Sequence, residues 1–192
     1  MEVILSSFIL VAVSEMGDKT QLLAFSLASR FRKPWVVIAG VLVATLANHA
    51  LAASVGSLVS SHVPPRVMAG ILAALFIAFG LWTLKPDTLE ETKETGHFGA
   101  FVTTVILFFL AEMGDKTQLA TVGLAARYQS VVRVTIGTTL GMMAANGPAV
   151  FLGEKLAGKV QMKWVRWLAA SLFFLFGIVS LVAAVRGVPT AP

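Results

Sequence analysis

The sequence predicts an all-α integral membrane protein with six transmembrane helices, arranged as two inverted three-helix repeats (3+3). Composition, the lengths of the apolar stretches and an internal duplication all predict this fold. Of the 192 residues, 57% are hydrophobic and 13% are charged, and the mean hydropathy is +0.83. Soluble domains contain about 45–50% apolar and about 25% charged residues. The apolar residues lie in long blocks, as spans across a hydrocarbon core of about 30 Å require.

Each of the six apolar stretches is long enough to cross a membrane as one helix. The predicted helices cover residues 3–29, 34–60, 67–84, 99–126, 131–157 and 164–186. Pro34 suits a first helical turn, and Pro64-Pro65 suits a short turn between antiparallel neighbours. The first stretch is read as a span rather than a signal peptide, because no basic segment precedes it and it contains Glu15 and Asp18.

The second half of the chain repeats the first at a shift of 97 residues, without a gap. Residues 15–22 and 112–119 both read Glu-Met-Gly-Asp-Lys-Thr-Gln-Leu. The further identities pair Arg30 with Arg127, Gly40 with Gly137, Gly56 with Gly153 and Phe76 with Phe173. We therefore predict a first repeat at 1–84, a cytoplasmic linker at 85–98 and a second repeat at 99–192. Because each repeat has three spans, the second must enter the membrane from the opposite side.

The basic residues between the predicted spans indicate the orientation. Nine lie in the first, third and fifth loops and four lie on the other side. The nine are Arg30, Arg32, Lys33, Lys85, Lys93, Lys155, Lys159, Lys163 and Arg166, and the four are Arg66, Arg127, Arg133 and Arg186. Cytoplasmic loops carry the excess of Lys and Arg, so we expect both termini outside and the third loop in the cytoplasm. This distribution also argues against nucleic-acid binding, which needs one basic face.

Each repeat carries ionisable residues near the middle of its first predicted span. A charge at the bilayer centre costs at least about 2.5–3.5 kcal/mol, so such groups must face one another or a wet cavity. Three of them lie in each motif: Glu15, Asp18 and Lys19 in the first, and Glu112, Asp115 and Lys116 in the second.

The geometry of a continuous helix predicts how each motif is arranged. On such a helix Glu15 and Asp18 share a face, and Lys19 follows Glu15 by four residues, so its ammonium can neutralise that carboxylate. Gly17 and Gly114 are expected to let the two motif helices approach closely.

We predict one metal site at the membrane midplane, with Glu15, Asp18, Glu112 and Asp115 as ligands. Together with two lysines these four carboxylates sum to −2, which one divalent cation cancels, and protons can replace that cation. Oxygen ligands suit Mg²⁺, Ca²⁺ and Mn²⁺, and the absence of cysteine removes thiolate ligands and disulfides. The further candidate ligands or coupling residues are Lys19, Thr20, Gln21, Lys116, Thr117, Gln118, Asn48 and Asn146.

Several polar or soft side chains have two readings. Met16 and Met113 could add a thioether ligand, although simple packing is favoured because neighbouring helical residues diverge by about 100°. Asn48 and Asn146 could supply amide oxygens or join helices by hydrogen bonds. His49 could accept protons, but a hydrogen-bonded packing histidine is favoured. The acidic motifs could also be structural ion pairs, which are poor stabilisers when buried.

The twin Glu-x-Gly-Asp-Lys-Thr motifs in an inverted 3+3 arrangement resemble the calcium/manganese–proton exchangers of the Golgi type and the bacterial manganese exporters related to them. The resemblance covers essentially the whole chain. It implies that Glu15, Asp18, Glu112 and Asp115 bind the cation.

The expected function is therefore a secondary transporter of the inner membrane that exports Mn²⁺, and Ca²⁺ as a second ion, in exchange for H⁺. No enzymatic activity and no cofactor are expected, because neither a nucleophile triad nor a phosphate-binding loop is evident. A homo-oligomer is compatible with the sequence. The alternatives are an exporter of small cationic metabolites and a non-transport membrane scaffold held by buried ion pairs.

Overall fold

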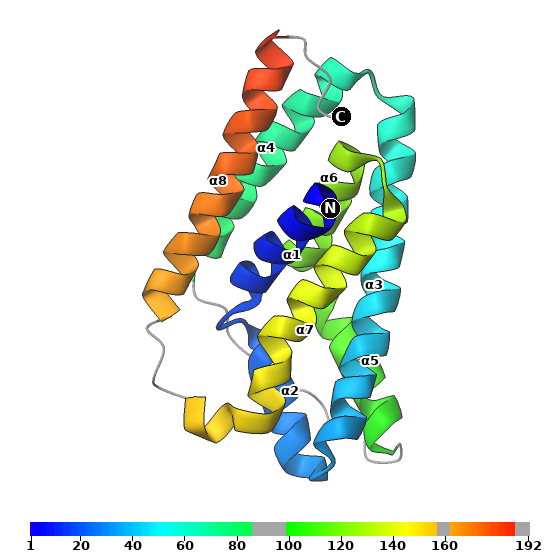
Figure 1. Cartoon of the computed structure of the whole chain (residues 1–192), viewed down its shortest axis with the longest axis vertical. Helices are drawn as coiled ribbons and strands as arrows, with labels where there is room; N and C mark the ends of the chain where they lie inside the picture. Colours follow the sequence, from blue (N-terminus) through cyan, green and yellow to red (C-terminus); the bar gives the residue numbers. More distant parts are fainter. Residues whose placement is uncertain (86–98, 157–161, 187–192) are drawn as a thin grey trace.

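The computed structural model describes residues 1–85, 99–156 and 162–186, and the secondary structure in these ranges is entirely helical. Figure 1 shows the helices in chain order. They are α1 (Glu2–Glu15), α2 (Lys19–Phe31), α3 (Pro34–His62), α4 (Pro65–Thr83), α5 (Ala100–Glu112), α6 (Lys116–Tyr128), α7 (Val131–Leu156) and α8 (Met162–Arg186).

The first and fourth predicted spans are each broken into two helices, so the prediction of continuous helices there was wrong. The breaks fall at the motif glycines, Gly17 and Gly114, whose φ angles are 79° and 74°. This left-handed conformation is readily adopted only by glycine and cannot continue a right-handed helix. Asp18 and Asp115 then take the N-cap positions of α2 and α6, but neither side chain caps its helix by a hydrogen bond.

The other predicted spans correspond to the long helices α3, α4, α7 and α8. Within the described residues, the segments Pro34–His62, Pro65–Thr83 and Arg166–Arg186 are long and apolar enough to cross a membrane, and Ala100–Glu112 is a shorter apolar helix. Many large apolar side chains on these helices are exposed, among them Leu58 and Val185. Such a surface is suited to lipid contact rather than to water. The predicted linker lies, apart from Lys85, outside the described residues.

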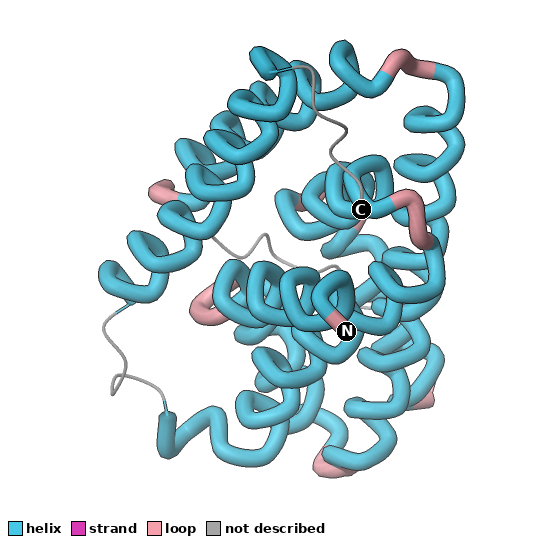
Figure 2. Tube along the Cα trace, turned by 45° about the horizontal axis from the view of Figure 1, so that its top comes forward, coloured by secondary structure: helices cyan, strands magenta, loops and turns pink. Residues whose placement is uncertain are grey.

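The helices of the two halves interleave instead of forming two separate bundles. α1 packs on α7 and α5 packs on α3, while α2 also contacts α7 and α6 also contacts α3. α4 and α8 lie side by side along one flank (Figures 1 and 2). Glycines make several of these contacts close, since a Cβ on Gly141 of α7 would lie 2.6 Å from the carbonyl oxygen of Phe8 in α1. The contacts therefore pair each helix with a helix of the other half.

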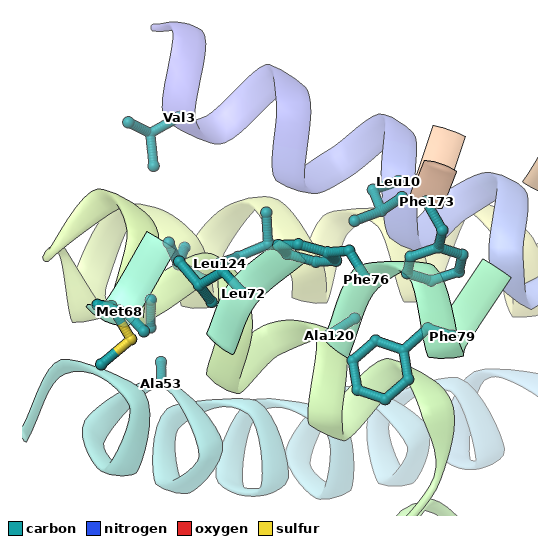
Figure 3. Close-up of a cluster of buried hydrophobic side chains, with 13 residues drawn as sticks. Val3, Leu10, Ala53, Met68, Leu72, Phe76, Phe79, Ala120, Leu124 and Phe173 are labelled. Atoms are coloured by element: carbon teal, nitrogen blue, oxygen red, sulfur yellow. The ribbon is translucent and has the colours of Figure 1, made fainter. Parts of the chain in front are cut away.

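Two apolar clusters fill the bundle. The first, called the flank cluster, joins α4 and α8 to α1, α3, α6 and α7 and is shown in Figure 3. Its large members include Leu10, Leu72, Phe76, Leu124 and Phe173. The second cluster joins α1, α2, α3, α5 and α7, and none of its described members belongs to α4 or α8. The helix pair α4–α8 is thus anchored through the flank cluster.

Candidate metal centre

The two helix breaks meet in the interior and bring carboxylates of both halves together. Glu15 is the last residue of α1, Glu112 is the last residue of α5, and Asp115 precedes α6. One oxygen atom from each of these three carboxylates can be chosen so that all lie within 4.8 Å of one another, and all three residues are buried. The fold therefore brings together two motifs that lie far apart in the sequence.

The helix ends surround this cluster with backbone dipoles. α1 and α5 end at the glutamates, and α2 and α6 begin just after the aspartates. The last carbonyl groups of a helix lack intrahelical partners and carry partial negative charge, whereas the first N–H groups carry partial positive charge. Broken helices in transporters use such carbonyl ends to coordinate cations. The centre thus lies at two helix C-terminal ends, where the carbonyls of Glu15 and Glu112 accept from Asp18 N at 3.0 Å and Asp115 N at 3.2 Å.

A threonine holds each glutamate by one of its two carboxylate oxygens. Thr20 Oγ1 donates to Glu15 Oε2 at 2.8 Å, and Thr117 Oγ1 donates to Glu112 Oε2 at 3.1 Å. The other oxygen, Oε1 of both glutamates, is buried and has no hydrogen-bond partner in the described part of the chain. Each glutamate is therefore oriented by one oxygen and presents the other for a ligand.

The lysines pair with aspartates of the opposite half. Lys116 Nζ lies 2.9 Å from Asp18 Oδ1, and Lys19 Nζ lies 3.3 Å from Asp115 Oδ1. The expected pairing of Lys19 with Glu15 along one helix was wrong, because the chain turns between them and α2 starts in a new direction. The two pairs differ in burial, since the Lys116 side chain is 4% exposed and that of Lys19 is 29% exposed.

The glutamines of the motifs stabilise the turns. Gln21 Oε1 accepts from Gly17 N at 3.0 Å, and Gln118 Oε1 accepts from Gly114 N at 2.7 Å. Their amide groups donate to the other half, from Gln21 Nε2 to the Ala145 carbonyl at 2.8 Å and from Gln118 Nε2 to an asparagine at the same distance. No atom lies within 4 Å of a Cβ built on Gly114. The expectation that this glycine permits close helix packing was wrong, because its role is conformational.

The polar residues of α3 and α7 are placed unequally. Asn48 Oδ1 is the acceptor of the Gln118 amide, so Asn48 joins α3 to α6. Asn146 Nδ2 donates within its own helix to the carbonyl of Met142 at 3.2 Å. His49 is fully buried, but neither ring nitrogen has a protein partner among the described residues. This contradicts the favoured reading of His49 as a hydrogen-bonded packing residue.

The motif methionines lie on the outside of the bundle. Met16 and Met113 are 41% and 57% exposed, so neither side chain is buried in the acidic cluster. Their exposure follows from the turn at each helix break, which directs successive side chains to opposite sides.

Sequence reasoning identified the acidic residues but missed two kinds of partner. The pairing of each lysine with the aspartate of the other half depends on how the repeats pack. The Ala145 carbonyl, which binds Gln21, carries no signal in a side-chain pattern. The repeat itself was the signal that the two motifs belong together.

A buried acidic cluster at the breaks of helices from two interleaved halves defines a class of protein, because secondary transporters place their ion sites at such discontinuous helices. Comparison with protein families agrees. The family model described as divalent cation/proton antiporter GDT1 matches residues 3–91 and 100–187. The chain belongs to this family of transporters.

Relatives of the chain come from bacteria and plants. A proposed manganese exporter of Vibrio cholerae serotype O1 is 44% identical over 179 residues, which cover 93% of this chain and 90% of the relative. A GDT1-like protein of Synechocystis is 32% identical over 197 residues, covering 91% of this chain and 94% of the relative. GDT1-like protein 5 of Arabidopsis thaliana is 28% identical, with 93% and 95% covered. No solved structure matches the chain.

Proposed function

We propose that this antiporter exports Mn²⁺, with Ca²⁺ as a second substrate, in exchange for protons through one site at the membrane midplane. The observation that carries the proposal is the buried cluster of Glu15, Glu112 and Asp115, which draws carboxylates from both halves into one volume. Asp18 belongs to the same site through its contact with Lys116. A single site reached alternately from either side is what an exchanger requires.

The proposed topology is six spans in an inverted 3+3 arrangement, with α1–α2 and α5–α6 each forming one broken span. Helix lengths support it, since α1 and α2 have 14 and 13 residues and together reach the length of one membrane span. The exchange of partners also supports it, because α1 packs on α7 as α5 packs on α3. The distribution of Lys and Arg favours external termini in an inner membrane.

The ligand chemistry favours a hard divalent cation. Carboxylate oxygens are preferred by Mg²⁺, Ca²⁺ and Mn²⁺, and the relative from Vibrio cholerae is named for manganese. Three ligand atoms within 4.8 Å of one another match the size of one ion. A cationic metabolite would need a larger volume.

Charge balance accounts for the exchange with protons. Four carboxylates and two ammonium groups sum to −2, so one divalent cation neutralises the site. When the cation leaves, the two glutamates can take up protons at the buried Oε1 atoms that have no other partner among the described residues. Purely structural ion pairs would not need these two glutamates in addition to the two lysine–aspartate pairs.

Transport by purified protein in proteoliposomes tests the proposal. Influx of Mn²⁺, Ca²⁺ or Mg²⁺ is measured together with internal pH under an imposed proton gradient. We expect proton movement that depends on Mn²⁺ and, more weakly, on Ca²⁺. Vesicles in which none of the three metals moves protons would refute the exchanger.

The double variant Glu15→Gln, Glu112→Gln tests the site itself. We expect loss of both metal and proton flux, because the amides keep the size of the side chains but cannot bind protons or supply negative charge. Glu2→Gln is the matched control, since Glu2 is an exposed carboxylate at the start of α1, and it should transport normally. Unchanged flux in the double variant would show that the acidic cluster is not the transport site.

A further inference from the structure

The α4–α8 pair contacts the rest of the bundle asymmetrically. α4 packs on α6, and α8 packs on α1. Under the 97-residue repeat, the equivalent contacts would join α8 to α2 and α4 to α5. Among the described residues these two pairs make no comparable interface. The α4–α8 pair therefore packs on α1 and α6, the motif helices on the N-terminal side of the bundle. It lies away from α2 and α5, the motif helices on the opposite side.

Residues that are equivalent in the two repeats show the same asymmetry. Ala126 in α6 is buried, whereas its counterpart Ser29 in α2 is exposed. Gly123 is buried, and a Cβ there would lie 3.1 Å from the ring of Phe76 in α4, whereas its counterpart Ser26 is exposed. The last turns of α6 are thus covered, with α4 against Gly123, whereas the equivalent face of α2 is exposed.

An arginine at the end of α6 holds this helix against α8. Arg127, at the end of α6, donates from Nη1 to Ser180 Oγ in α8 at 3.1 Å. Its guanidinium carbon also lies 5.4 Å from the centroid of the Phe176 ring in α8. A hydrogen bond from a charged donor and a cation–π contact each favour this contact. Arg127 therefore links α6 directly to α8.

The equivalent contact between α2 and α4 is absent from the described residues, although the equivalent side chains are present in the sequence. Arg30, the counterpart of Arg127, is exposed and lies over its neighbour Phe31. The counterparts of Ser180 and Phe176 are Thr83 and Phe79 in α4. Thr83 Oγ1 is buried and has no hydrogen-bond partner among the described residues. The α4 side thus offers an unused acceptor at Thr83, while the Phe79 ring is buried in the flank cluster against Phe76 and Phe173.

We propose that Arg127 and Arg30 are alternate latches of the transport cycle. In the state described, Arg127 holds α8 and closes the N-terminal side. In the opposite state the α4–α8 pair swings onto α2 and α5, Arg127 releases Ser180, and Arg30 donates to Thr83 and stacks on Phe79. The inference rests on the proposed exchange function and adds to it the residues that select between its two states.

The chain contains no cysteine, so single introduced cysteines can report the two states. Ser29→Cys and Ala126→Cys place thiols at equivalent positions of the two repeats. Their rates of reaction with a water-soluble maleimide are measured in detergent, without metal. In the otherwise unchanged chain, Ser29→Cys should react and Ala126→Cys should be protected.

Arg127→Gln is then added to each reporter. We expect labelling at position 29 to fall and labelling at position 126 to rise, with the ratio of the rates changing by about tenfold, because a charged hydrogen bond of one state is lost. Arg30→Gln is the matched control and should not lower labelling at position 29. Both variants should slow metal flux, since each loses one latch.

Unchanged labelling in Arg127→Gln would overturn the proposal. If labelling rises at both positions, the variant is unfolded, and Ser180→Ala decides, because it removes only the acceptor hydroxyl. Ser180→Ala must then lower labelling at position 29 and raise labelling at position 126. If it does not, the proposed latch is refuted. The labelling needs no transported ion, so the latch can fail while exchange persists, and exchange can fail while the latch is observed.

Discussion

At the scale of single residues, the site depends on how its glutamates are held. Thr20 and Thr117 each lie five residues after the glutamate they bind. In a continuous helix that spacing would direct the two side chains to different faces, so the bond requires the turn between them. It fixes one carboxylate oxygen and leaves the other available to the ion.

Thr117→Val should weaken metal binding while leaving the protein folded. Removing the donor to Glu112 costs about 1 kcal/mol, so the Mn²⁺ concentration for half-maximal flux should rise about fivefold. Thr121→Val is the control, because Thr121 Oγ1 donates only to the carbonyl of Thr117 within α6 among the contacts described. Equal values for the two variants would contradict the assigned role of Thr117.

At the scale of elements, the helix breaks create the site. A continuous helix would bury the carbonyl groups near Glu15 and Glu112 in its own hydrogen bonds. The glycine turn ends α1 and α5 at these residues and starts α2 and α6 beyond them. The conformational freedom of two glycines therefore determines the position of four carboxylates.

Gly114→Ala should destabilise the protein by about 1–2 kcal/mol, the cost of a left-handed conformation for a residue with a Cβ. Space is available around the added methyl group, so strain is the only cost. Gly70→Ala in α4 is the control, because this position is also open but helical, and alanine should stabilise it by about 0.5–1 kcal/mol. Thermal unfolding in detergent measures both, and shifts of the same sign would contradict the explanation.

At the scale of the whole molecule, the interleaving of the two halves brings the motifs together. α3 of the first half packs on both α5 and α6 of the second. Gly56 makes the α3–α6 contact possible, because a Cβ there would clash with the carbonyl oxygen of Val122. The distance between the motifs is thus set by backbone contacts on either side of them.

Gly56→Ala should separate α3 from α6 and lower stability by about 1–3 kcal/mol, as overpacking does in tight interiors. Alanine otherwise favours a helix, so the sign of the effect distinguishes packing from propensity. The unfolding midpoint is again compared with that of Gly70→Ala. Stabilisation of both variants would mean that Gly56 is not a close contact. Mn²⁺ flux should also fall, because α6 carries Asp115 at its N-cap.

Much of the molecule was readable from the sequence. Composition and apolar stretches predicted a helical membrane protein. Of the four carboxylates that the duplicated motif singled out, the structure brings Glu15, Glu112 and Asp115 together and pairs Asp18 with Lys116. The composition, the apolar stretches and the motif depend only on residue type and spacing, which can be read directly from the sequence. The predicted Glu15–Lys19 pair assumed a continuous helix. This prediction was wrong because the motif glycines end the helix between these two residues.

By itself, the sequence determined that each half carries acids, a lysine and a threonine in the same order. It predicted that they meet, because burial in lipid is costly for any charge without a partner. Only the tertiary structure decided which partner each takes. Lys19 reaches Asp115 and Lys116 reaches Asp18, and Arg127 is engaged where Arg30 is not. The two lysine–aspartate pairs are equivalent under the repeat, whereas the contacts of the two arginines are not. A repeated sequence cannot specify that inequality, because it arises from the position of α4 and α8 against the bundle.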